Sequence, residues 1–180
     1  DIGLDTVGLD PSGRSIEVDE RMRAGDGLWA IGDIVGHGAF THMSMYQSAI
    51  AVASVLGKDG PAADYRAVPH VTFTDPEVGG VGMTEKQARD AGLTVRVGTT
   101  VLSASTRGWI AQADGLIKLV EDADRGVLVG AMVAGPAGGE ILGMLVTAVH
   151  AEVPTATLRT MIYAYPTLHR ALETAVADLS

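Results

Sequence analysis

The sequence has no cysteine among its 180 residues, so the chain itself can form no disulfide, thiolate metal site or thiol nucleophile. Aromatic residues make up only 4%. The most apolar run, 141–149, is interrupted by Gly143 and falls well short of the roughly 20 residues that a membrane-spanning helix needs. The net charge of -9 argues against a nucleic-acid partner. We therefore expect a soluble, cytoplasmic protein with no membrane span.

Other functional patterns are also missing from the sequence. There is no signal peptide at the start and no Gly-x-Gly-x-x-Gly nucleotide fingerprint. The five histidines lack the i, i+4 spacing of a metal site, so no metal is predicted. The first residue is Asp1 and no methionine precedes it, which suggests a piece of a longer polypeptide.

The first part of the chain contains the pattern of two short strands around a turn. Ile16 and Val18 alternate with polar residues, as in a half-buried strand. Residues 28–31 form a continuous apolar run, which is typical of a strand buried on both faces. That run stops abruptly at Gly32-Asp33, which indicates that a loop follows the strand.

A helix is predicted after this loop. It would begin at Thr41 as the N-cap and end just before Gly57, because glycine is favoured past a helix C-terminus. The segment 61–69 is rich in proline and small residues, and it is interpreted as a linker.

The remainder of the chain predicts a second, complete unit. A strand and a turn come first, and the turn Asp75-Pro76-Glu77 is expected to have solvated carboxylates. A helix with a capping box between Thr84 and Gln87 follows, and then three strands, of which the last two form a hairpin. Three helices complete the unit. The last is predicted over 167–179, and its apolar stripe at helical spacing consists of Leu168, Ala171, Leu172, Ala175, Val176 and Leu179.

Four segments occur in an order that is more specific than any one of them: GLWAIGD, FTHMSMYQSAIAVASVLG, HVTFTDPEVGGVGMTEKQARDAGL and AYPTLHRALETA. Together they resemble the C-terminal part of the pyridine-nucleotide-disulfide oxidoreductases, a family of flavoproteins. The resemblance implies an α/β fragment of an FAD-binding domain over 1–60 and a linker over 61–69. It also implies an α+β dimerisation domain, an antiparallel sheet with helices, over 70–180, through which the protein forms a homodimer.

The resemblance assigns four residues to FAD: Gly32, Asp33, Thr41 and His42. In the family, this Asp holds the ribityl hydroxyls and the start of the following helix faces the flavin ring. Physical reasoning agrees, because ligands bind beyond the carboxyl ends of strands in open α/β sheets and helix N-termini favour negative charge. The alternatives are a plain strand-ending turn and a solvated histidine. NAD(P)H is the second implied cofactor, and the family binds it upstream of this chain.

The segment AYPTLHR departs from the family pattern. In the family's disulfide reductases, a histidine before Pro-Thr is the acid-base catalyst and a glutamate orients it; here Tyr165 and Arg170 occupy these two positions. A phenol ordinarily loses its proton only near pH 10, so it is a poor proton shuttle. His169 is the other candidate catalytic residue. It lies about one helical turn from Tyr165, so the acid-base role is not transferred to it.

These departures favour a rebuilt site over a vestigial one, which remains the alternative. We therefore predict the C-terminal part of an FAD-dependent NAD(P)H oxidoreductase whose acceptor is a quinone rather than a disulfide. Such a fragment is expected to be inactive alone, and a non-catalytic homodimerisation module is the second hypothesis. Arg107 and Glu140 also match positions of the dimerisation domain and are interpreted as structural.

Overall fold

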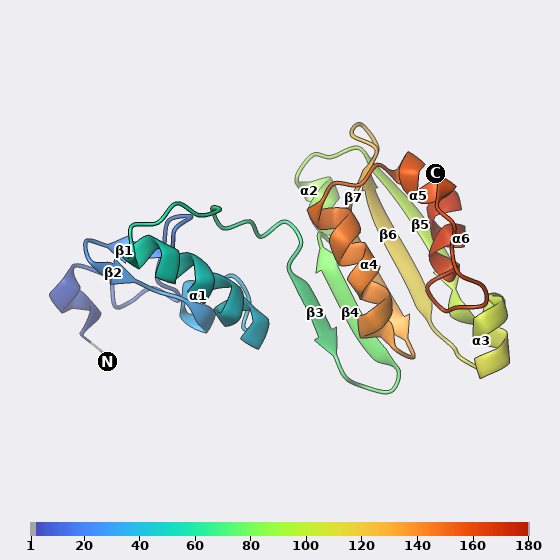
Figure 1. Ribbon diagram of the computed structural model, residues 1–180, viewed down its shortest axis with the longest axis horizontal. Coiled ribbons are helices and arrows are strands. Elements are labelled where there is room, and N and C mark those ends of the chain that lie inside the picture. The colour runs from blue at the N-terminus through green and yellow to red at the C-terminus, as the bar shows by residue number, and fades with distance from the viewer. Residues whose placement is uncertain (1–2, 180) are drawn as a thin grey trace. The chain divides into compact units, whose positions relative to one another are not determined.

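The computed structural model describes residues 3–179 and divides into two compact units, Asp1–Tyr65 and Arg66–Ser180. The outermost positions of the predicted ranges, 1, 2 and 180, lie outside the described residues. In Figure 1 the first unit runs from blue to teal and the second from green to red.

The first unit combines a short hairpin with one long helix. Strands β1 and β2 pair antiparallel, with Arg23 opposite Trp29. A small apolar core formed by Met22, Ile50 and Ala51 lies under the helix. The elements are η1 (Leu4–Val7), β1 (Arg23–Gly25), β2 (Leu28–Trp29), η2 (Gly32–Val35) and α1 (Thr41–Val55).

Of the two strand predictions for this unit, the one at 16–18 was wrong and the one at 28–31 is confirmed in part. Residues 16–18 belong to no strand, and the Ile16 N–H donates to the Ile34 carbonyl at 2.7 Å. The apolar run 28–31 contributes only the two residues of β2, and both are half-buried. Within the described residues β2 has β1 as its single strand neighbour. The predicted glycine after α1 is confirmed, since Gly57 has a φ of +62°.

The second unit is built on a five-stranded antiparallel sheet in the order β3-β4-β7-β6-β5 (Figure 1). This confirms the predicted antiparallel sheet and the predicted hairpin, which is β6 and β7. Strand β4 was missed, because its glycines lack the branched side chains that favour strands. The strands are β3 (Pro69–Thr72), β4 (Glu77–Gly82), β5 (Val95–Val101), β6 (Leu116–Asp122) and β7 (Val127–Gly135).

Helices complete the second unit. Helix α4 (Gly138–His150) packs on β7 and β4, while α6 (Ala171–Ala177) packs on β5 and β6 and contacts α5 (Thr155–Thr160). In Figure 1, α4 lies along β4 and β7, and α6 lies along β5. Helix α2 (Glu85–Asp90) follows β4, and α3 (Thr106–Ala111), which the sequence did not predict, follows β5. None of the helices within residues 3–179 is long and apolar enough to cross a membrane.

Local sequence signals for this unit are largely confirmed. The Thr84 hydroxyl accepts the Gln87 N–H at 3.2 Å while the Gln87 side chain accepts the Thr84 N–H at 2.8 Å, which is the predicted capping box. The predicted stripe of the last helix faces the core, where Leu172 and Ala175 are fully buried. The prediction for Glu77 was wrong: its Oε2 accepts the Gly139 N–H at 2.9 Å, so it caps the first turn of α4.

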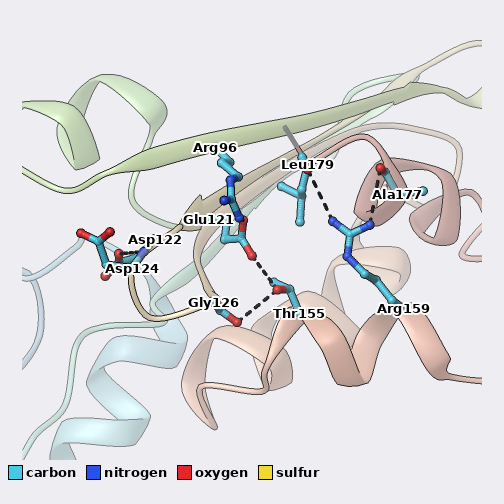
Figure 2. Close-up of polar contacts among 9 residues, drawn as sticks. All are labelled: Arg96, Glu121, Asp122, Asp124, Gly126, Thr155, Arg159, Ala177 and Leu179. Carbon is cyan, nitrogen blue, oxygen red and sulfur yellow. Dashed lines mark hydrogen bonds and ion pairs between the residues drawn. The ribbon is translucent and has the colours of Figure 1, made fainter.

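A buried carboxylate anchors α5 to the sheet (Figure 2). Glu121 on β6 is only 2% exposed, and its Oε1 accepts a hydrogen bond from the Thr155 hydroxyl at 2.5 Å. The Thr155 N–H donates to the Gly126 carbonyl at 2.8 Å. The other carboxylate oxygen of Glu121 has no hydrogen bond among the described residues and lies 3.5 Å from Arg96 Nη1. The first residue of α5 is therefore attached to the sheet by both its backbone and its side chain.

The end of α6 is held at two further points. Arg159 on α5 donates to the carbonyl oxygens of Ala177 and Leu179, at 3.5 and 3.4 Å (Figure 2). From the sheet, the Thr99 N–H donates to Asp178 Oδ2 at 2.8 Å. The segment between α5 and α6, which contains Tyr165, therefore connects two helices that are both held in place.

Candidate functional site

The first candidate site is the turn after β2. Gly32 opens η2 with a φ of +81°, and a Cβ on it would come within 2.9 Å of the Ser44 hydroxyl, so glycine is required there. Its N–H donates to Gln47 Oε1 at 2.6 Å in the interior. Asp33 is exposed, and within the described residues its carboxylate makes no hydrogen bond or ion pair. The turn thus presents an available carboxylate on a firmly held backbone.

The start of α1 lies at the other end of the same loop. Thr41 was predicted to be the N-cap, but the N-cap is Phe40 and Thr41 is the first helical residue. Because phenylalanine has no side-chain acceptor, no side-chain hydrogen bond caps this helix. Thr41 and His42 are exposed, and the His42 ring stacks on Phe40 with centroids 5.1 Å apart. The side chain of the N-cap residue therefore contributes no acceptor at the positive end of the α1 dipole.

The second candidate site surrounds Tyr165. Its hydroxyl donates to Thr106 Oγ1 at 3.2 Å, and the Arg170 guanidinium lies 5.5 Å from the centroid of its ring. The ring is 66% exposed. Arg170 also donates to the Tyr163 carbonyl at 3.1 Å and pairs with Glu173 at 2.9 Å. The tyrosine is therefore held from both sides while most of its ring remains accessible.

The predicted start of the last helix was wrong. Helix α6 begins at Ala171, so Tyr165 and Thr167 lie in the turns that precede it. Half of a capping box is present, because the Thr167 hydroxyl accepts the Arg170 N–H at 3.3 Å. The same hydroxyl donates to the Ala164 carbonyl at 2.6 Å. This pair of bonds fixes a turn rather than the first turn of a helix.

Tyr165 and His169 face different cavities. Tyr165 lines a cavity of about 210 Å³ together with Thr106 and Arg170, whereas His169 lines a cavity of about 630 Å³ together with Glu140. The residues that line both are Arg107, Pro166 and Thr167. The His169 ring lies 6.4 Å, between centroids, from the ring of Tyr163. The structure therefore does not bring the two candidate catalytic side chains into one cavity.

Three residues of these sites escaped the sequence reasoning. Thr106 was missed because α3 was not predicted. Tyr65 lies in a segment read as a linker. Gln47 gives a faint signal, as a single amide in a mostly apolar helix at a position that turns out to be fully buried. No cluster of three metal-ligating side chains occurs among the described residues.

Comparison with known proteins identifies the family. Residues 68–176 match the family described as pyridine nucleotide-disulphide oxidoreductase, dimerisation domain. The chain belongs to this family. It is 35% identical to dihydrolipoyl dehydrogenase of Geobacillus stearothermophilus over 93% of the chain, and 36% identical to that of Thermus scotoductus over 99%. The chain spans only 36% and 39% of the length of these two relatives.

Solved structures agree with this membership. LpdA from Mycobacterium tuberculosis superimposes with a TM-score of 0.86 at 25% identity, covering 97% of this chain and 39% of LpdA. RclA from Escherichia coli, described as an HOCl-induced flavoprotein disulfide reductase, gives a TM-score of 0.78 at 27% identity over 97% of this chain and 40% of RclA. In both cases nearly the whole chain, both units included, has a counterpart in part of a longer protein.

Proposed function

We propose that this chain is the C-terminal part of an FAD-dependent NAD(P)H oxidoreductase that works as a homodimer through residues 70–180. The observation that carries the proposal is the exposed Asp33 carboxylate at one end of a loop whose other end is a helix N-terminus with no hydrogen bond from its N-cap side chain. Family membership and the flavoprotein relatives support the same reading.

The residues of the first unit fit an FAD site. When bound, FAD accepts a hydride from NAD(P)H and passes electrons to the acceptor. The Asp33 carboxylate would accept hydrogen bonds from the ribityl hydroxyls, and its lack of a partner within the described residues suits this role. The first turn of α1, at Thr41 and His42, would donate backbone N–H groups to the flavin and favour its reduced, negatively charged state. Gly32 keeps the turn open, since a side chain there would meet Ser44.

The acceptor we propose is a quinone. A disulfide acceptor needs a group that titrates near neutral pH, as histidine does, and a carboxylate to orient it. Here Arg170 pairs with Glu173 and the Tyr163 carbonyl, so it cannot orient a base. The Tyr165 hydroxyl can instead donate a hydrogen bond to a carbonyl oxygen, exchanging its bond to Thr106. His169 is the second candidate, acting from the adjoining cavity.

The test uses the full-length protein that contains this chain. After anaerobic reduction with NAD(P)H, we expect faster turnover with benzoquinones than with lipoamide or glutathione. Tyr165→Phe should lower quinone turnover, while the control Tyr163→Phe, which alters a buried hydroxyl bonded to the Leu158 carbonyl, should not. Rapid reduction of lipoamide or glutathione would contradict the proposal that the acceptor is a quinone. A full-length protein without flavin would contradict the proposal that it is an FAD-dependent oxidoreductase.

A non-catalytic dimerisation module is the second candidate function for the chain as it stands. It is favoured by the length comparison, because the chain spans well under half of its relatives and lacks the nucleotide fingerprint. Size-exclusion chromatography of the 180-residue chain separates the two readings. A stable dimer without flavin supports the module, whereas a yellow eluate contradicts it.

A further inference from the structure

Gln47 is a fully buried amide that uses both of its polar ends. Its Oε1 accepts the Gly32 N–H at 2.6 Å, and its Nε2 donates to the Tyr65 hydroxyl at 3.2 Å. The core of the first unit is formed by the apolar side chains of Met22, Ile50 and Ala51, and Tyr65 packs against it. An amide in such surroundings is costly unless hydrogen-bonded, so the two bonds specify where both partners sit.

Tyr65 extends this connection to the loop itself. Its ring stacks on His37, with centroids 4.0 Å apart and an interplanar angle of 11°. Its hydroxyl donates to the Met22 sulfur at 3.7 Å while accepting from Gln47. Burial raises the pKa of this hydroxyl, so it remains protonated and can do both. Tyr65 thus joins a core amide to the loop residue His37.

The two contacts hold opposite parts of one loop, residues 32–40. Gln47 fixes its first residue, and Tyr65 fixes His37 near its end. Gly36 and Gly38, on either side of His37, both adopt positive φ, a conformation that glycine reaches without strain. Without such contacts a glycine-rich loop of this length would sample many conformations. The hydrogen bond from the Ile16 N–H to the Ile34 carbonyl holds the loop at a third point.

We infer that Gln47 and Tyr65 are positioning residues that hold the 32–40 loop in the shape that the flavin nucleotide requires. The inference rests on the proposed FAD site. It assigns a role to a core amide and to a residue of the connecting segment, neither of which contacts Asp33. The relay runs from the Gly32 N–H through Gln47 and the Tyr65 hydroxyl, and ends at the stacked His37 ring.

The experiment compares four forms of the full-length flavoprotein: wild type, Gln47→Met, Tyr65→Phe and the control Ile50→Val. Gln47→Met preserves volume but removes both hydrogen bonds. Tyr65→Phe removes only the hydroxyl. Ile50→Val lies one turn along α1 and lowers core stability while leaving every hydrogen bond of the relay in place. The measurements are the FAD dissociation constant of the apoprotein, thermal unfolding of the apoprotein, and the midpoint potential of the bound flavin.

We expect Gln47→Met to weaken FAD binding about tenfold and Tyr65→Phe about threefold, the effects of losing buried hydrogen bonds. Both variants should also lower the flavin midpoint potential, because a displaced α1 N-terminus stabilises the reduced anion less. Ile50→Val should reduce thermal stability while leaving affinity and potential at wild-type values.

Two results would overturn the inference, and they differ. If wild type binds FAD but the relay variants match Ile50→Val in affinity and potential, Gln47 and Tyr65 are only core residues and the proposed function stands. If wild type binds no FAD, the proposed function fails and the inference fails with it.

Discussion

Replacing Thr155 by valine should destabilise the second unit by about 2 kcal/mol. The change is nearly isosteric, so packing is preserved while Glu121 Oε1 loses its 2.5 Å hydrogen bond. The carboxylate is 2% exposed and its other oxygen already lacks a hydrogen bond among the described residues. Hydrogen bonds to buried charged groups contribute about 1.5–3 kcal/mol. Arg96 offsets little of the loss, because it lies 3.5 Å away and its side chain is 51% exposed.

The assay is calorimetric unfolding of the 180-residue chain, in which the unit that contains Thr155 should melt about 8 °C lower, given the unfolding entropy of a domain of this size. Repeating Thr155→Val in a Glu121→Gln background separates charge from packing. An uncharged amide still accepts the hydroxyl, and its loss costs only about 1 kcal/mol. A double-mutant coupling near zero, or an unchanged melting temperature for Thr155→Val alone, would refute the claim that a buried charge anchors α5.

Three further predictions concern the second unit. Gly98→Ala should lower the free energy of unfolding by about 3 kcal/mol, because its Cβ would overlap a backbone carbonyl of α6, whereas Gly143→Ala on the exposed side of α4 should raise it by about 1 kcal/mol. Urea denaturation measures both, and equal effects would contradict the clash. Burial, with a smaller contribution from Glu173, raises the pKa of Tyr163 above its ordinary 10.0. Its neutral form therefore adds stability that is complete below pH 10 and is lost as the pH rises through the folded-state pKa, so Tyr163→Phe should flatten the alkaline part of the stability curve. Arg170→Glu should destabilise the chain by about 1 kcal/mol, since it removes a backbone hydrogen bond and an ion pair and sets two carboxylates three residues apart. A gain in stability would mean that these losses are outweighed by a complete capping box, which the new carboxylate at position 170 would form with Thr167.

Sequence rules predicted the structure correctly where residues close together in the chain determine it. The Thr84–Gln87 capping box, Gly57 after α1 and the hairpin of β6 and β7 depend only on neighbours in the chain, and all three are confirmed. Strand β4 could not be predicted in this way. Its glycines have low strand propensity, and what makes the segment a strand is pairing with residues of β7 that lie 48 to 58 positions later in the chain. The strand predicted over 28–31 is shorter and less buried than expected for the same reason, because the extent of a strand depends on neighbours that periodicity cannot supply.

The same distinction between local and tertiary determinants applies to the residues of the candidate sites. Asp33 could be selected from its place after an apolar run, but its availability as a ligand follows from the surrounding contacts. Gln47 and Tyr65 lie 18 residues apart and meet only through the fold. Likewise, Tyr165 meets Thr106 across 59 residues, which no spacing rule anticipates. Sequence therefore locates residues of a site by type, while the partners that orient them come from tertiary structure.

The contacts of Arg170 bear on whether the Tyr165 site is rebuilt or vestigial. A positive charge just before a helix opposes the helix dipole, so an arginine left over from drift should extend into solvent. Arg170 instead pairs with Glu173, donates to the Tyr163 carbonyl and lies against the Tyr165 ring. The ion pair neutralises the unfavourable charge, and the other two contacts hold the segment that replaces the family's histidine. Because Arg170 supports Tyr165, these contacts favour our proposal of a site adapted to a different acceptor over a vestigial one.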